Sequence, residues 1–454
     1  MSIKKSIYEE LILESTDRTR TIDLTTGAIA FEYFEDIFSP TITAKIKVVN
    51  NGNVIAPADN KDGNLQSIYN GLPLRGGERL SLKIAGNSDK NPGLNFSKRP
   101  DDYFYVSSIT DVISETNRES FTLHLISREA ITNETTRVSN KFPTTFSISD
   151  SVEKILKDYL KTSRIGKLDK SSNTYGFIGN LRKPFTVLVW LASKAVPVNS
   201  QPATAGFLFY QTQDGFQFRS LDELMLQKSK ATYVYTEAQE SYDESGKKVD
   251  NDFKILNYYT DRNQKLIENL RLGTYSSQRM FFDPSNFSFT SPQVGLFKQK
   301  DFNNTNKIKS LGSGKLPKLP PLKDGSDKTL GDIPSRIITG ILDIGTLEPN
   351  NSNNYKKLNS NPLEYQSQTL MRYNTMFTQS LNIIVPSNTN LKAGDLIECL
   401  FPKITQSDQK EFDKETSGLY MIKELCHHFN AESSYTSMKL IRDSFGINTE
   451  PRRA

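Results

Sequence analysis

The sequence is poor in the residues from which protein metal sites are usually built. Among 454 residues it contains two cysteines and three histidines, His124, His427 and His428. His427 and His428 are adjacent in a run that we predict to be a β-strand, so their side chains point to opposite faces and cannot bind one ion together. We therefore expect no metal site.

The signatures of several common enzyme classes are also missing. The sequence contains no HExxH, CxxC, GxxxxGK[ST] or GxSxG motif, which mark zinc proteases, zinc ribbons, P-loop proteins and esterases. A carboxylate pair of the glycoside-cleaving kind stays open, because the 52 acidic residues offer many pairs whose separation the sequence does not give. We expect no catalytic residues, no cofactor and no enzymatic activity.

Long apolar runs and a charge excess of one sign are absent. No run approaches the ~20 apolar residues of a membrane span, and the start, MSIKKSIYEELILESTD, lacks a signal-peptide core. The 57 basic and 52 acidic residues give a net charge of +5, too small to favour a nucleic acid or an anionic membrane as partner. We expect a cytosolic protein that binds neither a membrane nor a specific nucleic-acid sequence. Its cysteines, Cys399 and Cys426, should be reduced and act as small buried apolar residues.

What the sequence does contain is a β-hairpin pattern that occurs twice. The runs 104–129 and 419–443 are each rich in β-branched and aromatic residues around a polar turn. The superposed pairs include Val106 and Ile422, Ile109 and Leu425, Phe121 and Tyr435, and His124 and Met438. Any two hairpins share some likeness, so a second shared segment is needed to decide between chance and duplication.

That second segment precedes each hairpin. Arg75–Glu78 matches Lys392–Asp395, and each contains a glycine, Gly77 or Gly394, before an acidic residue at the start of a strand. We expect both glycines to serve turns that a side chain would oppose. The apolar residues that follow should point into the two domains; they are Leu80, Leu82, Ile397 and Cys399. The two strands of the hairpin and this upstream segment occur in the same order in both copies, which favours one β-domain used twice.

Between the copies, the apolar period changes from two residues to between three and four. The spacing predicts a helix from Ile148 to Leu160, with a capping box at Asp150, and a second helix that begins at Pro184. Asp214-Gly215 between two aromatic runs predicts a tight hairpin. The only tryptophan, Trp190, lies in the second helix, where we expect core or interface packing.

A later stretch is rich in proline, glycine, lysine and aspartate. Pro317, Pro320 and Pro321 favour extended backbone, and their neighbours disfavour a packed core. Two interpretations stay open: a flexible loop, or an arm over Lys315–Lys328 that becomes ordered on a partner. A helix should follow from Pro362 to about Met376.

We therefore expect an α+β, mainly β fold with two similar tube-type β-barrel domains in one chain. The expected units are the first barrel (1–126), an α+β insertion (127–254), the second barrel (255–292 and 361–446), a loop-rich insertion within it (293–360) and a tail (447–454).

Several segments, in this order, resemble the central hub protein of contractile-tail baseplates in T4-like myoviruses, which is related to the hub part of type VI secretion spike proteins. They are LISREAITNETTRVSNKF, NLRKPFTVLVWLASKAVP with GFLFYQTQDGFQFRSLDEL, ENLRLGTYSSQRMFFDP, LKAGDLIECLFP, SGLYMIKELCHHF and YTSMKLIRDSFG. Together they span most of the chain, but residues 293–358 match no part of the family.

The resemblance implies a structural protein of the virion, assembled in the host cytoplasm. It implies a homotrimer whose barrels, two per chain, form a ring with the hexameric tail tube above, the trimeric spike below and other baseplate proteins around it. Three chains with two similar barrels each present six similar surfaces, which lets a threefold spike meet a sixfold tube. Two alternatives stay open: a tail-associated peptidoglycan hydrolase and a peripheral tail adhesin.

Overall fold

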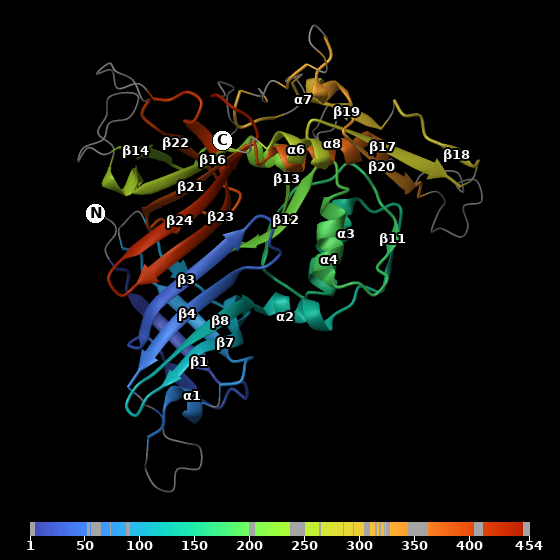
Figure 1. Ribbon diagram of the computed structural model, residues 1–454. Helices are drawn as coiled ribbons and strands as arrows, with labels where there is room; N and C mark the ends of the chain where they lie inside the picture. The colour runs from blue at the N-terminus through green and yellow to red at the C-terminus, as the bar shows by residue number, and fades with distance from the viewer. Residues whose placement is uncertain are drawn as a thin grey trace.

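The computed structural model of the chain consists mainly of β-strands, and most helices lie at one end of a large sheet (Figure 1). It describes residues 5–51, 55, 65–72, 74–87, 91–198, 205–236, 250–262, 265–284, 286–293, 295–303, 309–313, 316, 319–321, 323, 327–343, 359, 362–403 and 412–447. The expected α+β, mainly β class is confirmed.

The first β-domain is a sheet that folds over on itself. Its elements are β1 (Tyr8–Glu14), β2 (Thr21–Asp23), β3 (Ala28–Asp36), β4 (Thr43–Asn50), α1 (Ile68–Gly71), β5 (Arg79–Ile84), β6 (Leu94–Asn95), β7 (Phe104–Ser114) and β8 (Glu119–Ser127). β3, β4, β8 and β7 form one layer, and β5, β1 and β2 continue the sheet and cover it. Alternate side chains of both layers form one core. Leu80 and Leu82 point into this core, as predicted.

The second β-domain has the same two-layered arrangement. Its strands are β14 (Thr232–Tyr235), β15 (Lys254–Ile255), β16 (Asn257–Arg262), β21 (Gln379–Pro386), β22 (Leu396–Leu400), β23 (Gly418–Asn430) and β24 (Ser434–Arg442). Ile397 and Cys399 are buried in its core, as predicted. Strand β14 was expected in the insertion, but it pairs with β22 and buries Tyr233 in this core. The predicted start at residue 255 is therefore too late.

The two β-domains are joined edge to edge. β3 pairs antiparallel with the second half of β23, so that Phe31 lies opposite Phe429. Across the joint, the hydroxyl of Tyr8 donates to the carbonyl of Phe429 at 2.9 Å. One continuous sheet therefore runs through both domains, which strand propensity alone does not predict.

The domains also share strand pairings. Leu80 on β5 lies opposite Phe104 on β7, and Ile397 on β22 lies opposite Tyr420 on β23. Further along, each hairpin contains a register shift at the same place, after Val106 in β7 and after Ile422 in β23. The predicted match of the segments before the turn is thus confirmed.

After the turn, the predicted superposition is wrong by one residue. Leu123 lies opposite Ile109, and Met438 lies opposite Leu425, so Leu123 rather than His124 corresponds to Met438. The superposition had matched two aromatic rings, Phe121 and Tyr435, but the buried counterpart of Phe121 is Thr436. A slip of one residue in a strand moves every side chain to the other face.

The insertion has its own core. Its elements are α2 (Arg128–Thr135), β9 (Lys141–Phe142), α3 (Ile148–Asp158), β10 (Ile165–Leu168), β11 (Phe177–Ile178), α4 (Pro184–Ala192), β12 (Phe207–Thr212), β13 (Gly215–Ser220) and α5 (Leu221–Met225). Both predicted helices and the tight hairpin are confirmed, but the two turn residues are Gln213 and Asp214, because Gly215 already pairs with Thr212. The cap of α3 differs: Ser147, not Asp150, is the N-cap, and its hydroxyl accepts from the amide of Asp150 at 3.1 Å.

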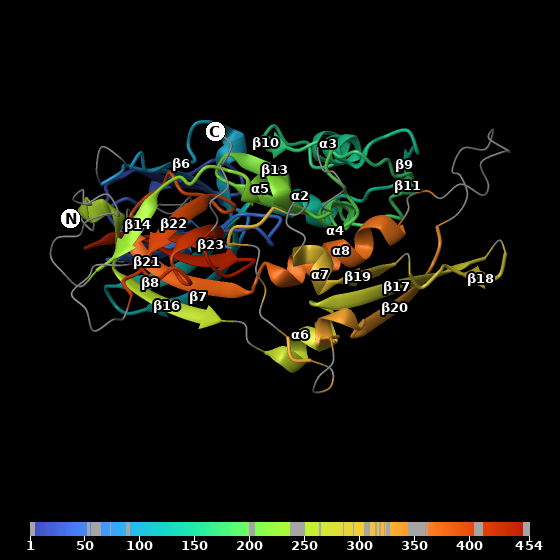
Figure 2. The ribbon, with the colours of Figure 1, turned by 90° about the horizontal axis from the view of Figure 1, so that it is seen from above.

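A fourth unit is a small sheet with helices around it, set beyond the end of the large sheet (Figure 2). It comprises α6 (Leu266–Leu272), β17 (Ser276–Asp283), β18 (Ser288–Phe289), β19 (Leu296–Lys298), α7 (Gln299–Asn303), β20 (Arg336–Ile341) and α8 (Pro362–Thr375). β17 was expected in the second barrel but pairs with β18, β19 and β20. The expected placement of α6, β17, β18 and α8 in that barrel is therefore wrong, although the helix predicted to begin at Pro362 is confirmed.

The predicted arm Lys315–Lys328 lies partly outside the described residues. We expected this segment not to pack in a core, but its residues Leu316 and Leu319 are buried. Leu316 packs in a cluster with Met371 of α8 and Phe297 of β19. The segment therefore finds apolar contacts within its own chain. Residues 448–454 of the expected tail also lie outside the described part.

Candidate assembly surface

The sheet that joins the two β-domains has one face that points away from both of their cores. Eight strands form it in the order β16, β21, β24, β23, β3, β4, β8 and β7, and every neighbouring pair is antiparallel. We call the face that points away from both cores the open face. One row across it takes a residue from each strand: Asn257, Ile384, Ser437, Cys426, Phe34, Thr43, Ile126 and Tyr105.

The open face mixes polar with apolar and aromatic side chains, and its charges are balanced. In the row just given, the apolar and aromatic residues are Ile384, Cys426, Phe34, Ile126 and Tyr105. Its serine, threonine and asparagine residues are accompanied, among the side chains described, by the charged residues Lys45, Lys47, Lys439, Glu32, Asp36 and Glu424. At the joint between the domains, the ammonium of Lys423 lies 2.7 Å from a carboxylate oxygen of Asp36 and 3.1 Å from one of Glu424. Such a wall has no strong field of one sign to hold a polyanion or polycation.

The histidines are divided between the two sides of the sheet. His427 is buried, its ring is stacked 6.1 Å from that of Tyr33, and burial lowers its pKa to about 3. His428 lies on the open face, where its Nδ1 is 3.3 Å from a carboxylate oxygen of Glu32. Burial lowers the pKa of His428, and the charge of Glu32 opposes this shift. The predicted opposite orientation is confirmed.

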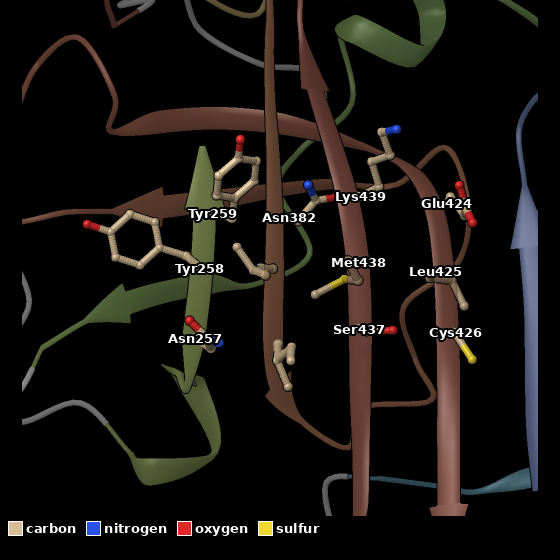
Figure 3. A pocket seen from close by; sticks show the side chains of 12 residues that line it. Asn257, Tyr258, Tyr259, Asn382, Glu424, Leu425, Cys426, Ser437, Met438 and Lys439 are labelled. Atoms are coloured by element: carbon tan, nitrogen blue, oxygen red, sulfur yellow. The ribbon is translucent and has the colours of Figure 1, made fainter. Parts of the chain in front are cut away.

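A shallow hollow of about 460 Å³ lies in the open face over the second β-domain. Figure 3 shows Tyr259, Asn382, Lys439 and Glu424 in line across β16, β21, β24 and β23. Below this line lies Cys426, which is buried and unpaired. Within the described residues, no group of three or more histidine, cysteine or acidic side chains could hold a metal ion.

Both outer edges of this sheet lack a strand partner over much of their length. In the described part of the chain, β16 pairs only with β21, and β7 beyond Val106 pairs only with β8. Side chains on both edges are exposed: Tyr259 on β16 is 67% exposed and Ile113 on β7 is 58% exposed. Exposed edge strands are templates for pairing with another chain.

A buried carboxylate fixes the first β-domain to the insertion and to the second β-domain. Glu35, at the end of β3, accepts hydrogen bonds from the hydroxyl of Tyr33 at 2.7 Å, the amide of Gln213 at 2.6 Å and the amide of Ala393 at 2.8 Å. Burial raises the pKa of Glu35 to about 7, which these three donors oppose. Sequence analysis missed this residue, because nothing in the sequence brings residues 35, 213 and 393 together.

A second buried network holds the fourth unit. The guanidinium of Arg372 on α8 lies 3.1 Å from a carboxylate oxygen of Asp222 and 3.6 Å from one of Asp443. Burial raises the pKa of Asp222 to about 6, and the charge of Arg372 opposes this.

Trp190, whose packing was predicted, lies on α4 with its ring edge-on to Tyr175 and is 39% exposed. None of the helices in the described residues is long and apolar enough to cross a membrane.

Comparison with known proteins identifies the fold. The sequence matches no protein-family model and no curated protein. Its structure is similar to that of a tail protein from Neisseria meningitidis, with a TM-score of 0.53 at 8% identity over 96% of this chain and 97% of that one. A prophage tail protein from Shewanella oneidensis gives a TM-score of 0.49 at 8% identity, over 96% of this chain and 98% of that one. A component of the E. coli type VI secretion system, whose structure is similar to the T4 tail proteins gp27 and gp5, gives a TM-score of 0.41 at 10% identity, over 94% of this chain and 77% of that one. The expected resemblance is therefore confirmed at the level of the fold: this chain has the fold of a tail protein over nearly its whole length.

Proposed function

We propose that this protein is the central hub of a contractile-tail baseplate, in which three copies close a ring. The observation that carries the proposal is the open sheet with two unpaired edges. Its eight antiparallel strands make β16 and β7 run in opposite directions, so β16 of one copy can pair antiparallel with β7 of the next. The contact is heterologous and forms a closed ring when the rotation between copies is 120°.

The same proposal accounts for the two faces of the sheet. In a closed ring the open face becomes the inner wall, and its hydroxyl, amide and balanced charged groups suit a channel that does not retain what passes through it. The repeated β-domains would present six similar surfaces to a hexameric tail tube, while the threefold axis would suit a trimeric spike. Tube, spike and other baseplate proteins are the proposed partners, and the assembled virion tail is the proposed location.

We also propose a role without catalysis. A peptidoglycan hydrolase needs an acid of raised pKa in a cleft that admits sugar. Among the described residues, the acids with raised pKa values are Glu35, Asp222 and Asp395. Glu35 and Asp222 are buried between units, and Asp395 is bound within its own turn to the amide of Lys392. A zymogram of the purified protein tests this, and a clearing zone in the peptidoglycan layer would overturn it.

The ring is tested by light scattering and electron-microscope images of the purified protein, alone and with the spike protein of the same tail. Trimers with threefold symmetry are expected in at least one condition, since ring closure can require a partner's surface. Ile113→Lys, at the free edge of β7, should reduce trimer formation, whereas Ile12→Lys on the outer strand β1 (37% exposed) should not. A stable dimer or tetramer in both conditions would contradict the hub proposal.

A further inference from the structure

We infer that, in the ring, helix α6 of one copy docks against helix α2 of the next, so that each joint has a helical contact beside its strand pairing. The inference rests on the proposed ring. It concerns two short helices that lie beside opposite edges of the large sheet, α6 after β16 and α2 after β8 (Figure 1).

The direction of the strands places both helices at the same end of the sheet. Six antiparallel steps lead from β16 through β21, β24, β23, β3 and β4 to β8, so β16 and β8 point the same way. β16 ends at Arg262 and α6 begins at Leu266, while β8 ends at Ser127 and α2 begins at the next residue. When β16 meets β7 of the next copy, α6 therefore reaches the end of the joint where that copy carries α2.

The exposed faces of the two helices are chemically complementary. On α6, Ile267 is 60% exposed, and Arg271 follows one turn later on the exposed side. On α2, Ile131 is 37% exposed, and Glu134 follows it with a side chain that is 60% exposed. Each helix thus offers one isoleucine and one charge, and the charges have opposite signs. Glu134 already pairs with Lys183, itself 40% exposed, so Arg271 would join an existing surface pair.

The size of the joint also calls for a contact outside the strands. β16 has six residues, and the unpaired part of β7 is of similar length. Stable protein interfaces usually bury about 1,200–2,000 Å² in total, which one short strand pair does not provide. Apolar side chains flanking the strands are the usual supplement, and Ile267 and Ile131 are available at this end.

The test is a charge exchange in the full-length protein, measured by sedimentation in the condition, with or without the spike protein, in which the unmodified protein forms trimers. Arg271→Glu and Glu134→Arg should each weaken trimer formation about three- to tenfold, and the double variant should restore it, since a rim charge pair is worth roughly 1 kcal/mol. Lys265→Glu, the same charge change at the start of α6, should have no effect. Unchanged trimers in both single variants, while Ile113→Lys still breaks the ring, would overturn the helix contact and leave the ring intact.

A cross-link gives a second measurement that does not depend on the Glu134–Lys183 pair. A variant with Ile131→Cys and Ile267→Cys should form disulfide-linked trimers on mild oxidation, and either single variant should not. Native Cys399 and Cys426 are buried and do not compete. Failure to cross-link within trimers would also overturn the contact. If no trimer forms in either condition, the ring proposal fails, and this inference fails with it.

Discussion

The amide of Gly394 donates a hydrogen bond of 2.8 Å to the carbonyl of Ile422, and the amide of Gly77 donates one of the same length to the carbonyl of Val106. The reverse bonds, from Val106 to the carbonyl of Glu78 and from Ile422 to that of Asp395, are 2.8 and 2.9 Å long. Both glycines have positive φ angles, +96° at Gly77 and +89° at Gly394. The two turns are therefore the same structural device, used once in each β-domain, as the sequence predicted.

We predict that alanine at these glycines destabilises the two domains unequally. Both substitutions force a side chain into the left-handed region, at about 1–3 kcal/mol. At Gly77 a Cβ atom would lie 3.8 Å from Thr16, which is ordinary contact, whereas at Gly394 it would lie 2.4 Å from the hydroxyl of Tyr210. Gly394→Ala should therefore lower the free energy of unfolding more than Gly77→Ala, as measured by denaturant titration. Equal losses of unfolding free energy in the two variants would show that backbone strain alone sets the cost, without a contribution from the contact with Tyr210.

Glu35 should make the protein less stable as the pH rises. Its pKa is about 7 in the folded chain and 4.5 ordinarily, so the folded state binds the proton more tightly. The resulting stability is fully present below pH 4.5 and is lost as the pH rises through about 7, by roughly 3 kcal/mol at most. Glu35→Gln should flatten this pH dependence in thermal unfolding between pH 5 and 8, while Glu268→Gln, an exposed carboxylate, should leave it unchanged. A slope that persists in Glu35→Gln would assign the effect to another group.

Removing Arg372 should destabilise the fourth unit strongly. Arg372→Met leaves the buried carboxylate of Asp443 without its cation, and breaking a buried pair on one side costs about 3–5 kcal/mol. Lys157→Met, which breaks the exposed pair with Glu153 on α3, should cost about 0.5 kcal/mol or less. Chemical denaturation of both variants gives the comparison. Similar losses would mean that the buried network relaxes without Arg372.

The single tryptophan can show whether the insertion unfolds separately from the β-domains. Trp190 packs on the insertion core, which is distinct from the main cores of both β-domains, although a further buried cluster with Ile37, Leu208 and Leu396 connects the three units. We predict that its fluorescence and the far-ultraviolet circular dichroism of the β-sheets give different unfolding midpoints. Trp190→Phe should remove the fluorescence signal with little change in stability. Coincident transitions would show that insertion and β-domains unfold as one unit.

The sequence predicts local devices well and long-range pairings poorly. The glycine turns, the helix at Pro184 and the hairpin at Asp214-Gly215 follow from residues that are neighbours in the chain. The pairing of β3 with β23 depends on residues far apart in sequence. The alternation of apolar and polar residues shows which face of each strand is buried, but not which strands pair. The short strand β14 was missed because Thr232–Tyr235 is too brief to show a period.

The open face and its unpaired edges could be predicted only in part. Alternation in β8 separates buried Leu123 from outward His124, yet it does not tell whether the outward side is covered by another element. Glu35 carries little local signal, because only Tyr33 among its three donors is near it in the sequence and the other two come from distant segments. The open face, its unpaired edges and the contacts of Glu35 can therefore be recognised only in the folded structure.

The joint between β3 and β23 also sets the order of events during synthesis. Phe31 leaves the ribosome roughly 400 residues before its partner Phe429, which at about 5–20 residues per second is a wait of roughly 20 to 80 s. Throughout that time the β3 edge of an already folded first domain is open to strands of other nascent chains. The edge of β3 therefore stays exposed until β23 has been synthesised. The yield of folded protein in a cell should depend on chaperones that shield β3 until translation ends.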